Sequence, residues 1–196
     1  MPRMRLLIIA VCLTLVAAEA AQAQGCGYAH RAPADGRIGV APLALGDSVM
    51  LGAAKRLSQK GFEVDARCAR NPGEGVSIPR QRRRRGTLPE IVVMALGTNI
   101  AASRRDIARM LRAAGRRRTL MLVTPLRDWR PFHTEPMRRA ARRRPNRVRL
   151  IDWSGHASRN RHWLWSDGTH LRPGGIEAYA RILRRAAWSR LRGRFG

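Results

Sequence analysis

The chain has 196 residues, a formal net charge of +26, and only two lysines, Lys55 and Lys60, among its 39 basic residues. Its length suits one domain with a sizeable core, and beyond the N-terminal region no stretch is apolar and long enough to span a bilayer, which excludes a multi-span membrane protein. Cysteine and histidine do not occur at the spacings of a zinc site, so neither a metal nor another cofactor is expected.

The N-terminal region has the features of a secretory signal peptide. A basic start precedes an apolar run from residue 6 to residue 18, and Ala21-Gln22-Ala23 offers a small-x-small cleavage site. We therefore expect residues 1–23 to be a signal peptide and residues 24–196 to form one exported domain, periplasmic or fully secreted. An uncleaved N-terminal anchor is the alternative, although the apolar run is shorter than the roughly 20 residues of a comfortable span.

Two cysteines, Cys26 and Cys68, remain in the exported part. An oxidising compartment favours a single disulfide between them, and two unpaired thiols are the alternative. Closing that loop would stabilise the fold by about 4 kcal/mol on the chain-entropy model.

Downstream of the signal peptide, short apolar runs alternate with amphipathic helical stretches. The predicted strands are 38–45, 62–66, 91–96, 119–124 and 148–151, and the predicted helices are 49–59, 104–114, 135–143 and 175–190. The arginine-rich stretch 80–85 fits either a short helix or a loop. Because the run 91–96 is apolar on both faces, it suits a parallel sheet covered by helices, and the alternation predicts a three-layer α/β/α sandwich.

Polar motifs follow the predicted strands at the points where ligands bind in such sheets. Gly46-Asp47-Ser48 follows the first strand, Gly97-Thr98-Asn99 follows the run 91–96, and Asp152 follows the last strand. The motif Asp167-Gly168-Thr169-His170 occupies the turn before the final helix. We expect these motifs to share one edge of the sheet.

Together these motifs supply a hydroxyl, an imidazole and a carboxylate. A serine hydroxyl needs a base, and the base needs an acid that fixes its tautomer, so Ser48, His170 and Asp167 form a candidate catalytic set. The spacing of three residues lets Asp167 reach one ring nitrogen of His170 while the other faces Ser48. The alternative is that Ser48 and Asp167 merely cap helices. Rival groups without a partner at a useful spacing are His133, His156, His162 and Asp152.

Asn99 and several tryptophans are further candidates. The Asn99 carboxamide can donate to a developing oxyanion, a contribution of roughly 3 kcal/mol in a transition state, or it can satisfy a local turn. Trp129 and Trp153 could stack on sugar rings, as could Trp163 and Trp165, which are the best placed because they come just before Asp167. Ordinary packing is the alternative for each of them.

As an ordered set, these stretches resemble the SGNH (GDSL-type) hydrolase superfamily, most closely the extracytoplasmic SGNH domains of cell-wall and polysaccharide O-acetyltransferases. The matching stretches are Leu45 to Ala53, Val64 to Arg67, Ala95 to Asn99, Leu150 to Trp153 and Asp167 to Gly175. The resemblance implies a flavodoxin-like sandwich with Ser48 as nucleophile, His170 as base and Asp167 as orienting acid. It also implies an oxyanion hole made by the Ser48 N–H, the Asn99 side chain and a further backbone N–H, for which Ala69 is the best match.

The resemblance implies an esterase or acyltransferase acting on O-acyl groups, with acetyl esters of envelope glycans or small esters as substrates. Transfer would require a separate membrane protein that supplies the acyl group, whereas hydrolysis requires only water. The alternative is an exported polyanion-binding protein with a vestigial triad, which the arginine content alone supports. An anionic envelope polymer would suit the charge, and no nucleic-acid partner is expected because no nucleic-acid-binding module is recognisable.

Overall fold

The computed structural model describes residues 27–192, with side chains described to residue 191. A sheet at its centre has six strands in the order β1 (Tyr28–Arg31), β3 (Glu63–Arg67), β2 (Leu43–Gly46), β4 (Ile91–Ala95), β5 (Thr119–Val123) and β8 (Val148–Ile151). Only β1 runs antiparallel to its neighbour in this sheet. Numbered along the chain, the five parallel strands lie in the order 2-1-3-4-5, which is the flavodoxin-like order.

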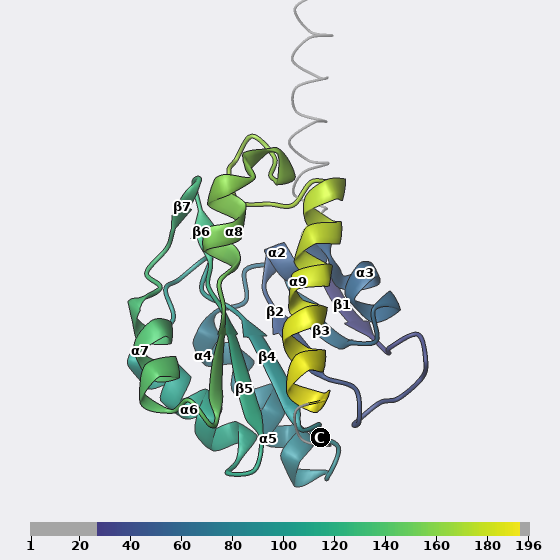
Figure 1. Ribbon diagram of the computed structural model, residues 1–196. Helices are drawn as coiled ribbons and strands as arrows, with labels where there is room; N and C mark the ends of the chain where they lie inside the picture. The colour runs from purple at the N-terminus through teal and green to yellow at the C-terminus, as the bar shows by residue number, and fades with distance from the viewer. Residues whose placement is uncertain (1–26, 193–196) are drawn as a thin grey trace, which may run out of the picture.

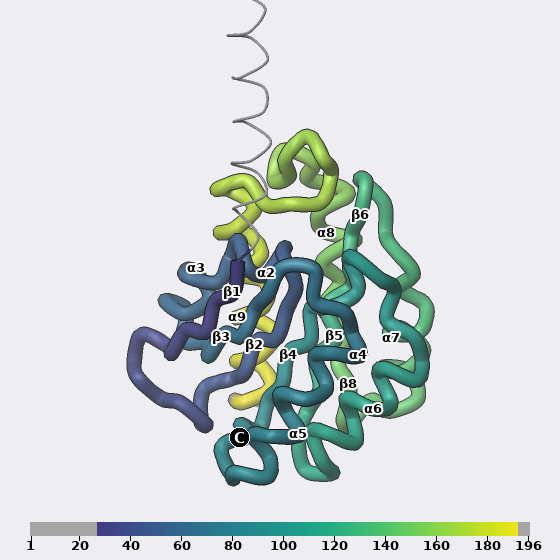
Figure 2. The backbone as a smooth tube through the Cα atoms, turned by 180° about the vertical axis from the view of Figure 1, so that it is seen from behind, coloured from purple at the N-terminus to yellow at the C-terminus, as the bar shows by residue number. Residues whose placement is uncertain are grey.

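Helices cover both faces of this sheet, as Figures 1 and 2 show from opposite sides. One face carries α2 (Ser48–Gly52), α3 (Ala54–Gln59), α8 (Trp153–Arg159) and α9 (Pro173–Arg192), and the other carries α4 (Pro72–Gly75), α5 (Ser77–Arg84), α6 (Arg104–Ala114) and α7 (Glu135–Arg143). The predicted three-layer α/β/α sandwich is therefore confirmed. Among the described residues, no helix has the length and apolarity needed to cross a membrane.

The buried side chains of β4 alternate between the two helical layers. Ile91 and Val93 pack into the core beneath α9, whereas Val92 and Met94 pack into the core beneath α6. All four are at most 1% exposed. Burying an aliphatic side chain of this size contributes about 1.5 to 3 kcal/mol, so the two-sided apolar pattern holds the sheet between its helices.

The largest differences from the predicted elements lie in the segments 38–45 and 49–59, and the arginine-rich stretch proves to be mostly helical. The predicted strand 38–45 is paired only from Leu43, because Gly39 has a left-handed φ of 83° and the chain turns there. Ile38 and Val40 are consequently 54% and 68% exposed. The predicted helix 49–59 is divided at Ala53 into α2 and α3. The arginine-rich stretch 80–85 belongs mostly to helix α5, which ends at Arg84.

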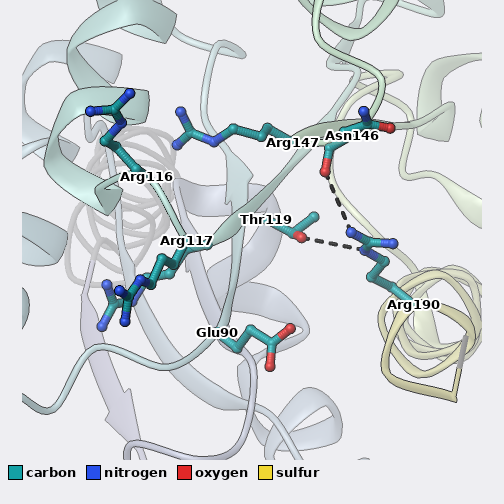
Figure 3. Close-up of a pocket in the computed structure, with 8 residues that line it drawn as sticks. Glu90, Arg116, Arg117, Thr119, Asn146, Arg147 and Arg190 are labelled. Atoms are coloured by element: carbon teal, nitrogen blue, oxygen red, sulfur yellow. Dashed lines mark hydrogen bonds between the residues drawn. The ribbon is translucent and has the colours of Figure 1, made fainter. Parts of the chain in front are cut away.

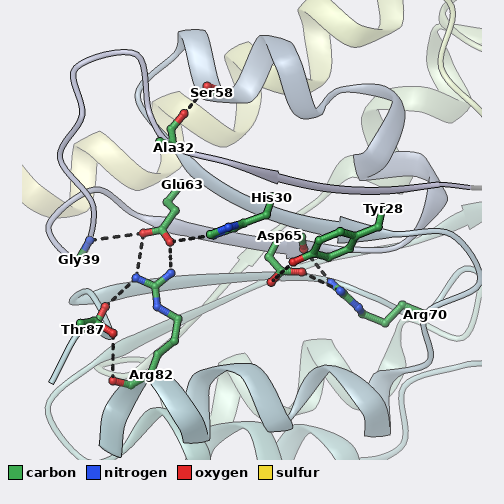
Figure 4. Close-up of polar contacts among 10 residues, drawn as sticks. All are labelled: Tyr28, His30, Ala32, Gly39, Ser58, Glu63, Asp65, Arg70, Arg82 and Thr87. Atoms are coloured by element: carbon green, nitrogen blue, oxygen red, sulfur yellow. Dashed lines mark hydrogen bonds and ion pairs between the residues drawn. The ribbon is translucent and has the colours of Figure 1, made fainter. Parts of the chain in front are cut away.

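A buried carboxylate explains why α5 carries an arginine on its inner face. Glu63 of β3 is 1% exposed and accepts two hydrogen bonds from Arg82, one of them at 2.9 Å (Figure 4). His30 of β1 lies 3.3 Å from the same carboxylate. Burial alone would raise the pKa of Glu63, but the bonds and charge of Arg82 and the bond to His30 outweigh it and lower that pKa. The edge strand β1 and helix α5 are thus joined to β3 by polar side-chain contacts as well as by apolar packing.

The start of α9 packs against η1 (Arg161–Trp163) so closely that one glycine has no room for a side chain. A Cβ on Gly175 would lie 2.0 Å from the carbonyl oxygen of Trp163, whereas nothing lies within 4 Å of a Cβ on Gly174. That carbonyl also accepts a hydrogen bond from the Arg172 N–H at 2.8 Å. Leu164 and Leu171 then pair as an isolated bridge, which closes the loop between them.

We therefore predict that Gly175→Ala lowers the free energy of unfolding by about 1 to 3 kcal/mol, because backbone must move to admit the methyl group. The matched control Gly174→Ala should leave stability unchanged or raise it by up to about 1 kcal/mol, since alanine favours helix over glycine. Urea denaturation followed by circular dichroism measures both. Equal effects of the two substitutions would contradict the close contact.

Candidate active site

The Ser48 side chain stands where β2 meets α2, beside the end of β4. Since β2 and β4 flank the point at which the strand order reverses, this is the crevice in which open α/β sheets bind ligands. Asp47 caps α2 and is 1% exposed. One of its carboxylate oxygens accepts from the Val49 N–H at 3.2 Å, and the other accepts from the Thr98 N–H at 3.3 Å. Asp47 thereby ties the turn before Ser48 to the turn before Asn99.

The burial of Asp47 has an electrostatic consequence. Desolvation raises the pKa of the Asp47 carboxyl above its ordinary value, although bonds from Thr98 and Val49 and the proximity of His170 oppose the shift. Burial and the charge of Asp47 also raise the pKa of Tyr179, which lies wholly buried in α9. The sequence motif identified Asp47 only as part of the turn, and its role as the link between two strand ends becomes visible in the fold.

The structure brings Ser48, His170 and Asp167 into one hydrogen-bonded line. Nε2 of His170 lies 2.9 Å from the Ser48 Oγ, and Nδ1 of His170 lies 2.7 Å from an Asp167 carboxylate oxygen. The other Asp167 oxygen accepts from the backbone N–H groups of Thr169 and His170, at 2.9 and 3.0 Å. Residues separated by 122 positions in the sequence therefore meet at hydrogen-bond distance.

The ionisation of Asp167 fixes the direction of these hydrogen bonds. Partial burial alone would raise the pKa of Asp167, but bonds from the backbone and ring of His170 and from the Thr169 N–H outweigh it and lower that pKa. An ionised carboxylate only accepts, so the Nδ1–H of His170 donates to it. In the neutral imidazole Nε2 is then left as the acceptor for the Ser48 hydroxyl.

A short hairpin that the sequence did not indicate supports the Asp167–His170 turn. It consists of β6 (Leu126–Arg127) and β7 (Arg130–Pro131), joined by Asp128 and Trp129, which both have positive φ. The Asp128 N–H donates to the Thr169 hydroxyl at 3.2 Å, and the Trp129 N–H donates to the Gly168 carbonyl at 3.0 Å. A Cβ on Gly168 would lie 2.7 Å from the Trp129 ring, so only glycine fits there.

The buried side chain of Arg70 holds the loop that contains Ala69 against the Ser48 turn. Arg70 is 5% exposed, and its guanidinium lies 2.7 Å from an Asp65 carboxylate oxygen (Figure 4). The same guanidinium donates to the Gly46 carbonyl at 3.3 Å. Ala69 has a left-handed φ of 54°, a conformation that glycine adopts more readily. It is exposed and is not among the residues that line the pocket at Ser48. Its backbone role in an oxyanion hole stays a prediction.

An open pocket of about 260 Å³ surrounds the Ser48–His170 pair. Its lining residues are Ser48, Thr98, Asn99, Arg127, Asp128, Asp167, Thr169 and His170. Asn99 is exposed at this pocket, where its position was expected. The side chains of His170 and Asp167 are 46% and 48% exposed, so the hydrogen-bonded line faces solvent along much of its length.

The two tryptophans expected to be best placed for contact with a sugar, Trp163 and Trp165, lie in different environments. Trp163 packs on the core and stacks on Trp153 with ring centroids 6.0 Å apart. Trp165 is 49% exposed, and the Arg172 guanidinium lies 4.9 Å from its ring centroid. The Trp165 N–H donates to the His170 carbonyl at 2.9 Å, so its backbone closes the loop that contains His170. Contact with a substrate stays a prediction for both.

Three of the four rival groups make contacts elsewhere. Asp152 caps α8 and pairs with Arg138 at 2.9 Å. His133 packs edge-on against Phe132, and His162 packs edge-on against Trp163. Among the described residues, no group of three or more histidine, cysteine, aspartate or glutamate side chains is arranged to hold a metal ion.

No protein-family model matches the chain. It is 26% identical over 144 residues to YrhL of Bacillus subtilis, which is provisionally described as a peptidoglycan O-acetyltransferase; the match covers 72% of this chain and only 23% of that protein. In structure it is similar to the C-terminal catalytic domain of peptidoglycan O-acetyltransferase A (OatA) of Streptococcus pneumoniae, with a TM-score of 0.65, 23% identity, and coverage of 80% of this chain and 94% of that one. A provisionally identified SGNH hydrolase of Slackia heliotrinireducens matches with a TM-score of 0.56 and 19% identity. This match covers 74% of the present chain and 97% of the hydrolase chain. The resemblance to the SGNH hydrolases is thereby confirmed at the level of the fold.

We predict that the free energy of unfolding of the wild type, minus that of Asp47→Asn, increases as the pH falls from neutrality toward about 4. The raised pKa means that the native state binds more protons at Asp47 than the unfolded state does, so this group's contribution to stability is lost as pH rises. The comparison with asparagine cancels the contributions of other carboxyls. Urea denaturation of both proteins across this pH range measures the difference, and a difference that shrinks or stays constant on acidification would contradict the assignment.

Proposed function

We propose that the protein is an exported serine esterase or O-acyltransferase that removes or transfers O-acyl groups, in the first place acetyl groups, on envelope glycans or small esters. The observation that carries this proposal is the continuous line from Ser48 Oγ through the His170 ring to Asp167, with distances of 2.9 and 2.7 Å. In this proposal Ser48 is the nucleophile, His170 the general base and Asp167 the acid that orients it.

The reaction follows from these positions. The His170 Nε2 takes the proton of Ser48 as its oxygen attacks the ester carbonyl, and Asp167 stabilises the imidazolium that forms. The imidazolium returns the proton to the leaving alcohol, which leaves an acyl group on Ser48. Water or a sugar hydroxyl, deprotonated by the same ring, then accepts that acyl group.

A developing negative charge on the carbonyl oxygen needs hydrogen-bond donors. The Ser48 N–H has no hydrogen-bond partner among the described residues, because Asp47 accepts from Val49 instead. It lies at the first turn of α2, with the Asn99 side chain on the same pocket. We assign the oxyanion hole to these two groups and to the Ala69 N–H in the neighbouring loop.

The shape of the pocket favours a small acyl group on a large carrier. Its volume of about 260 Å³ is below the range of roughly 300 to 1,000 Å³ that encloses a drug-sized ligand. Since the side chains of His170 and Asp167 are about half exposed, most of a bulky substrate would lie outside. The names of YrhL and OatA refer to peptidoglycan O-acetylation, and an acetylated glycan is the substrate we propose for this chain. Trp165, half exposed beside His170, is the better placed tryptophan to contact a sugar.

Export and the disulfide are parts of the same proposal. Residues 1–23 and Cys26 lie outside the described residues, so the signal peptide and the pairing of Cys26 with Cys68 stay predictions. The Cys68 N–H donates to the Gly27 carbonyl at 3.0 Å, which places the residue next to Cys26 beside Cys68. A bridge there would fasten the loop that contains Ala69.

A polyanion-binding protein with a vestigial triad is the competing function. The net charge of +26 favours it, but an inactive triad has no need of the hydrogen bonds that hold Asp167 and His170 in line. The two functions differ in a direct way, because only the enzyme reacts with a serine-directed phosphonate.

We predict that Ser48→Ala lowers kcat for a small acetyl ester such as p-nitrophenyl acetate by at least about 10³-fold, because the nucleophile is lost. Circular dichroism should show an unchanged fold. The matched control is Ser77→Ala, whose surface hydroxyl bonds only to the Glu74 carbonyl, and it should retain full activity. A fluorophosphonate should label the wild type on the peptide that contains Ser48. Undiminished turnover by Ser48→Ala, or labelling of another residue, would reject the proposal.

We predict that Asn99→Ala and Asn99→Asp lower kcat by about 10² to 10³-fold with little change in KM, because the carboxamide donates to charge that develops only in the transition state. Ile100→Ala, at an exposed neighbour in the same turn, serves as the control and should leave kcat near that of the wild type. Steady-state kinetics on the same ester measure these effects. If Ile100→Ala lowered kcat as much as Asn99→Ala, the turn rather than the carboxamide would be responsible.

A further inference from the structure

An arginine-lined pocket of about 480 Å³ lies at the amino ends of the strands, whereas Ser48 lies at their carboxyl ends. Its residues come from the segments that precede β4, β5 and β8, and from α9, so they gather at the amino ends of the strands (Figure 3). Five arginines and one carboxylate are among its eight lining residues, which are Glu90, Arg116, Arg117, Arg118, Thr119, Asn146, Arg147 and Arg190.

The hydrogen bonds that the structure gives these arginines go to neutral oxygens. Arg118 donates to the carbonyls of residues 88, 89 and 114, and Arg147 donates to the Gly115 carbonyl. Arg190 donates to the Thr119 hydroxyl and to the Asn146 carbonyl, both at 3.4 Å. These neutral acceptors orient the guanidinium groups without cancelling their charge. The one carboxylate of the pocket, Glu90, stands against five arginines, so the pocket keeps a positive potential.

Some of the guanidinium N–H groups at this pocket make no hydrogen bond among the described residues. The Nε of Arg147 is buried and has no hydrogen-bond partner among the described residues. A buried donor without a partner is costly. Arg116 and Arg117 are exposed in the turn before β5, where their guanidinium groups are available to a ligand. Burial, and after it the charge of the nearby Arg83, lowers the pKa of Arg118.

The basic surface extends beyond this pocket. A second pocket of about 520 Å³ shares Arg190 with the first and adds Arg149 of the edge strand β8. Its other lining residues are Met121, Leu150, Ala186 and Ser189. A single ion would fill only part of two adjoining pockets, whereas a chain with repeated charges could occupy both. No lining residue of either pocket is aromatic, so neither offers a ring on which a nucleic-acid base could stack.

We propose that the pocket formed by Arg116, Arg117, Arg118, Arg147 and Arg190 is a binding site for the phosphodiester groups of an extended, non-aromatic polyanion such as a polyol phosphate chain. The guanidinium fork suits phosphate oxygens because it can donate two parallel hydrogen bonds to them. The site is separate from the Ser48 pocket, so a bound chain leaves the hydrogen-bonded line open.

The test measures binding of an end-labelled poly(glycerol phosphate) oligomer to the full chain by fluorescence anisotropy over a range of NaCl concentrations. The double variant Arg116→Ser/Arg117→Ser removes two exposed side chains from the pocket. The matched control Arg159→Ser/Arg181→Ser removes the same charge from exposed positions on α8 and α9. Turnover of p-nitrophenyl acetate is measured for all of them, and Ser48→Ala is included in the binding series.

The double variant should bind about tenfold more weakly at low salt. Its plot of log affinity against log salt concentration should be less steep by roughly 1.5, because each of the two lost phosphate contacts contributes about 0.7 to 0.9 to the magnitude of the slope. The control should bind within about twofold of the wild type on the same electrostatic reasoning. Ester turnover should be unchanged in both variants, and Ser48→Ala should bind normally, so failure of the site and failure of the proposed enzyme are distinguishable.

Equal losses in the double variant and the control would show that net charge alone attracts the chain, and would overturn the assigned site. Unchanged binding by the double variant would overturn it as well. An oligothymidylate with the same number of phosphates should bind no more tightly than the glycerol phosphate oligomer. Tighter binding of oligothymidylate would reject the non-aromatic ligand in favour of a nucleic acid.

Discussion

The geometry of the candidate active site depends on one buried carboxylate at the point where the strand order reverses. Asp47 accepts the N–H groups of Val49 and Thr98 and so joins the carboxyl ends of β2 and β4. A buried charge is costly unless its hydrogen bonds are satisfied, and here the fixed donors offset much of that cost. Because one oxygen is committed to each turn, Ser48 and Asn99 cannot move independently. The pocket is therefore shaped by backbone amides, whose positions the sheet determines, more than by mobile side chains.

The fold accommodates its high net positive charge in part because two buried carboxylates pair with the arginines that are themselves largely buried. Glu63 and Asp65 lie buried in β3 and neutralise Arg82 and Arg70, the arginines that are drawn inside. Many other arginines lie at the surface, and some of them repel one another. In α7 the neighbouring Arg143 and the Arg104 side chain of α6 lower the pKa of Arg139. Self-repulsion of this kind destabilises the compact state, so anions that gather on the surface stabilise the fold.

The sequence was sufficient for the sheet and for the motifs at its edge, because two-sided apolar runs such as 91–96 have few other uses. Ser48 and Asn99 were correctly expected at one edge, since both follow parallel strands. The hairpin turn Asp128–Trp129 could not be predicted, because its positive φ angles are stabilised by contacts with Gly168 and Thr169, which are distant in the sequence. Strand β1 was missed for a similar reason: it is a short, polar edge strand that pairs only with β3. Local sequence patterns predict helices and strands that pack through apolar side chains. They do not predict β1 or the β6–β7 hairpin, which are held by polar contacts with residues distant in the sequence.

The two opposite edges of the sheet provide separate surfaces for a polymer. Strands of five residues rise about 3.3 Å per residue, which places the arginine pocket roughly 16 Å or more from Ser48. A small ligand bound at the amino ends of the strands therefore does not block the pocket at their carboxyl ends. A flexible chain must be several units long to reach both pockets. If the protein is the esterase or acyltransferase proposed above, tethering through the arginine pocket would raise its effective concentration near the polymer and leave the Ser48 pocket unchanged. For the proposed function this division suits a shallow, half-exposed site, because affinity for a large substrate would come from charge at a distance while the Ser48 pocket would select the acyl group.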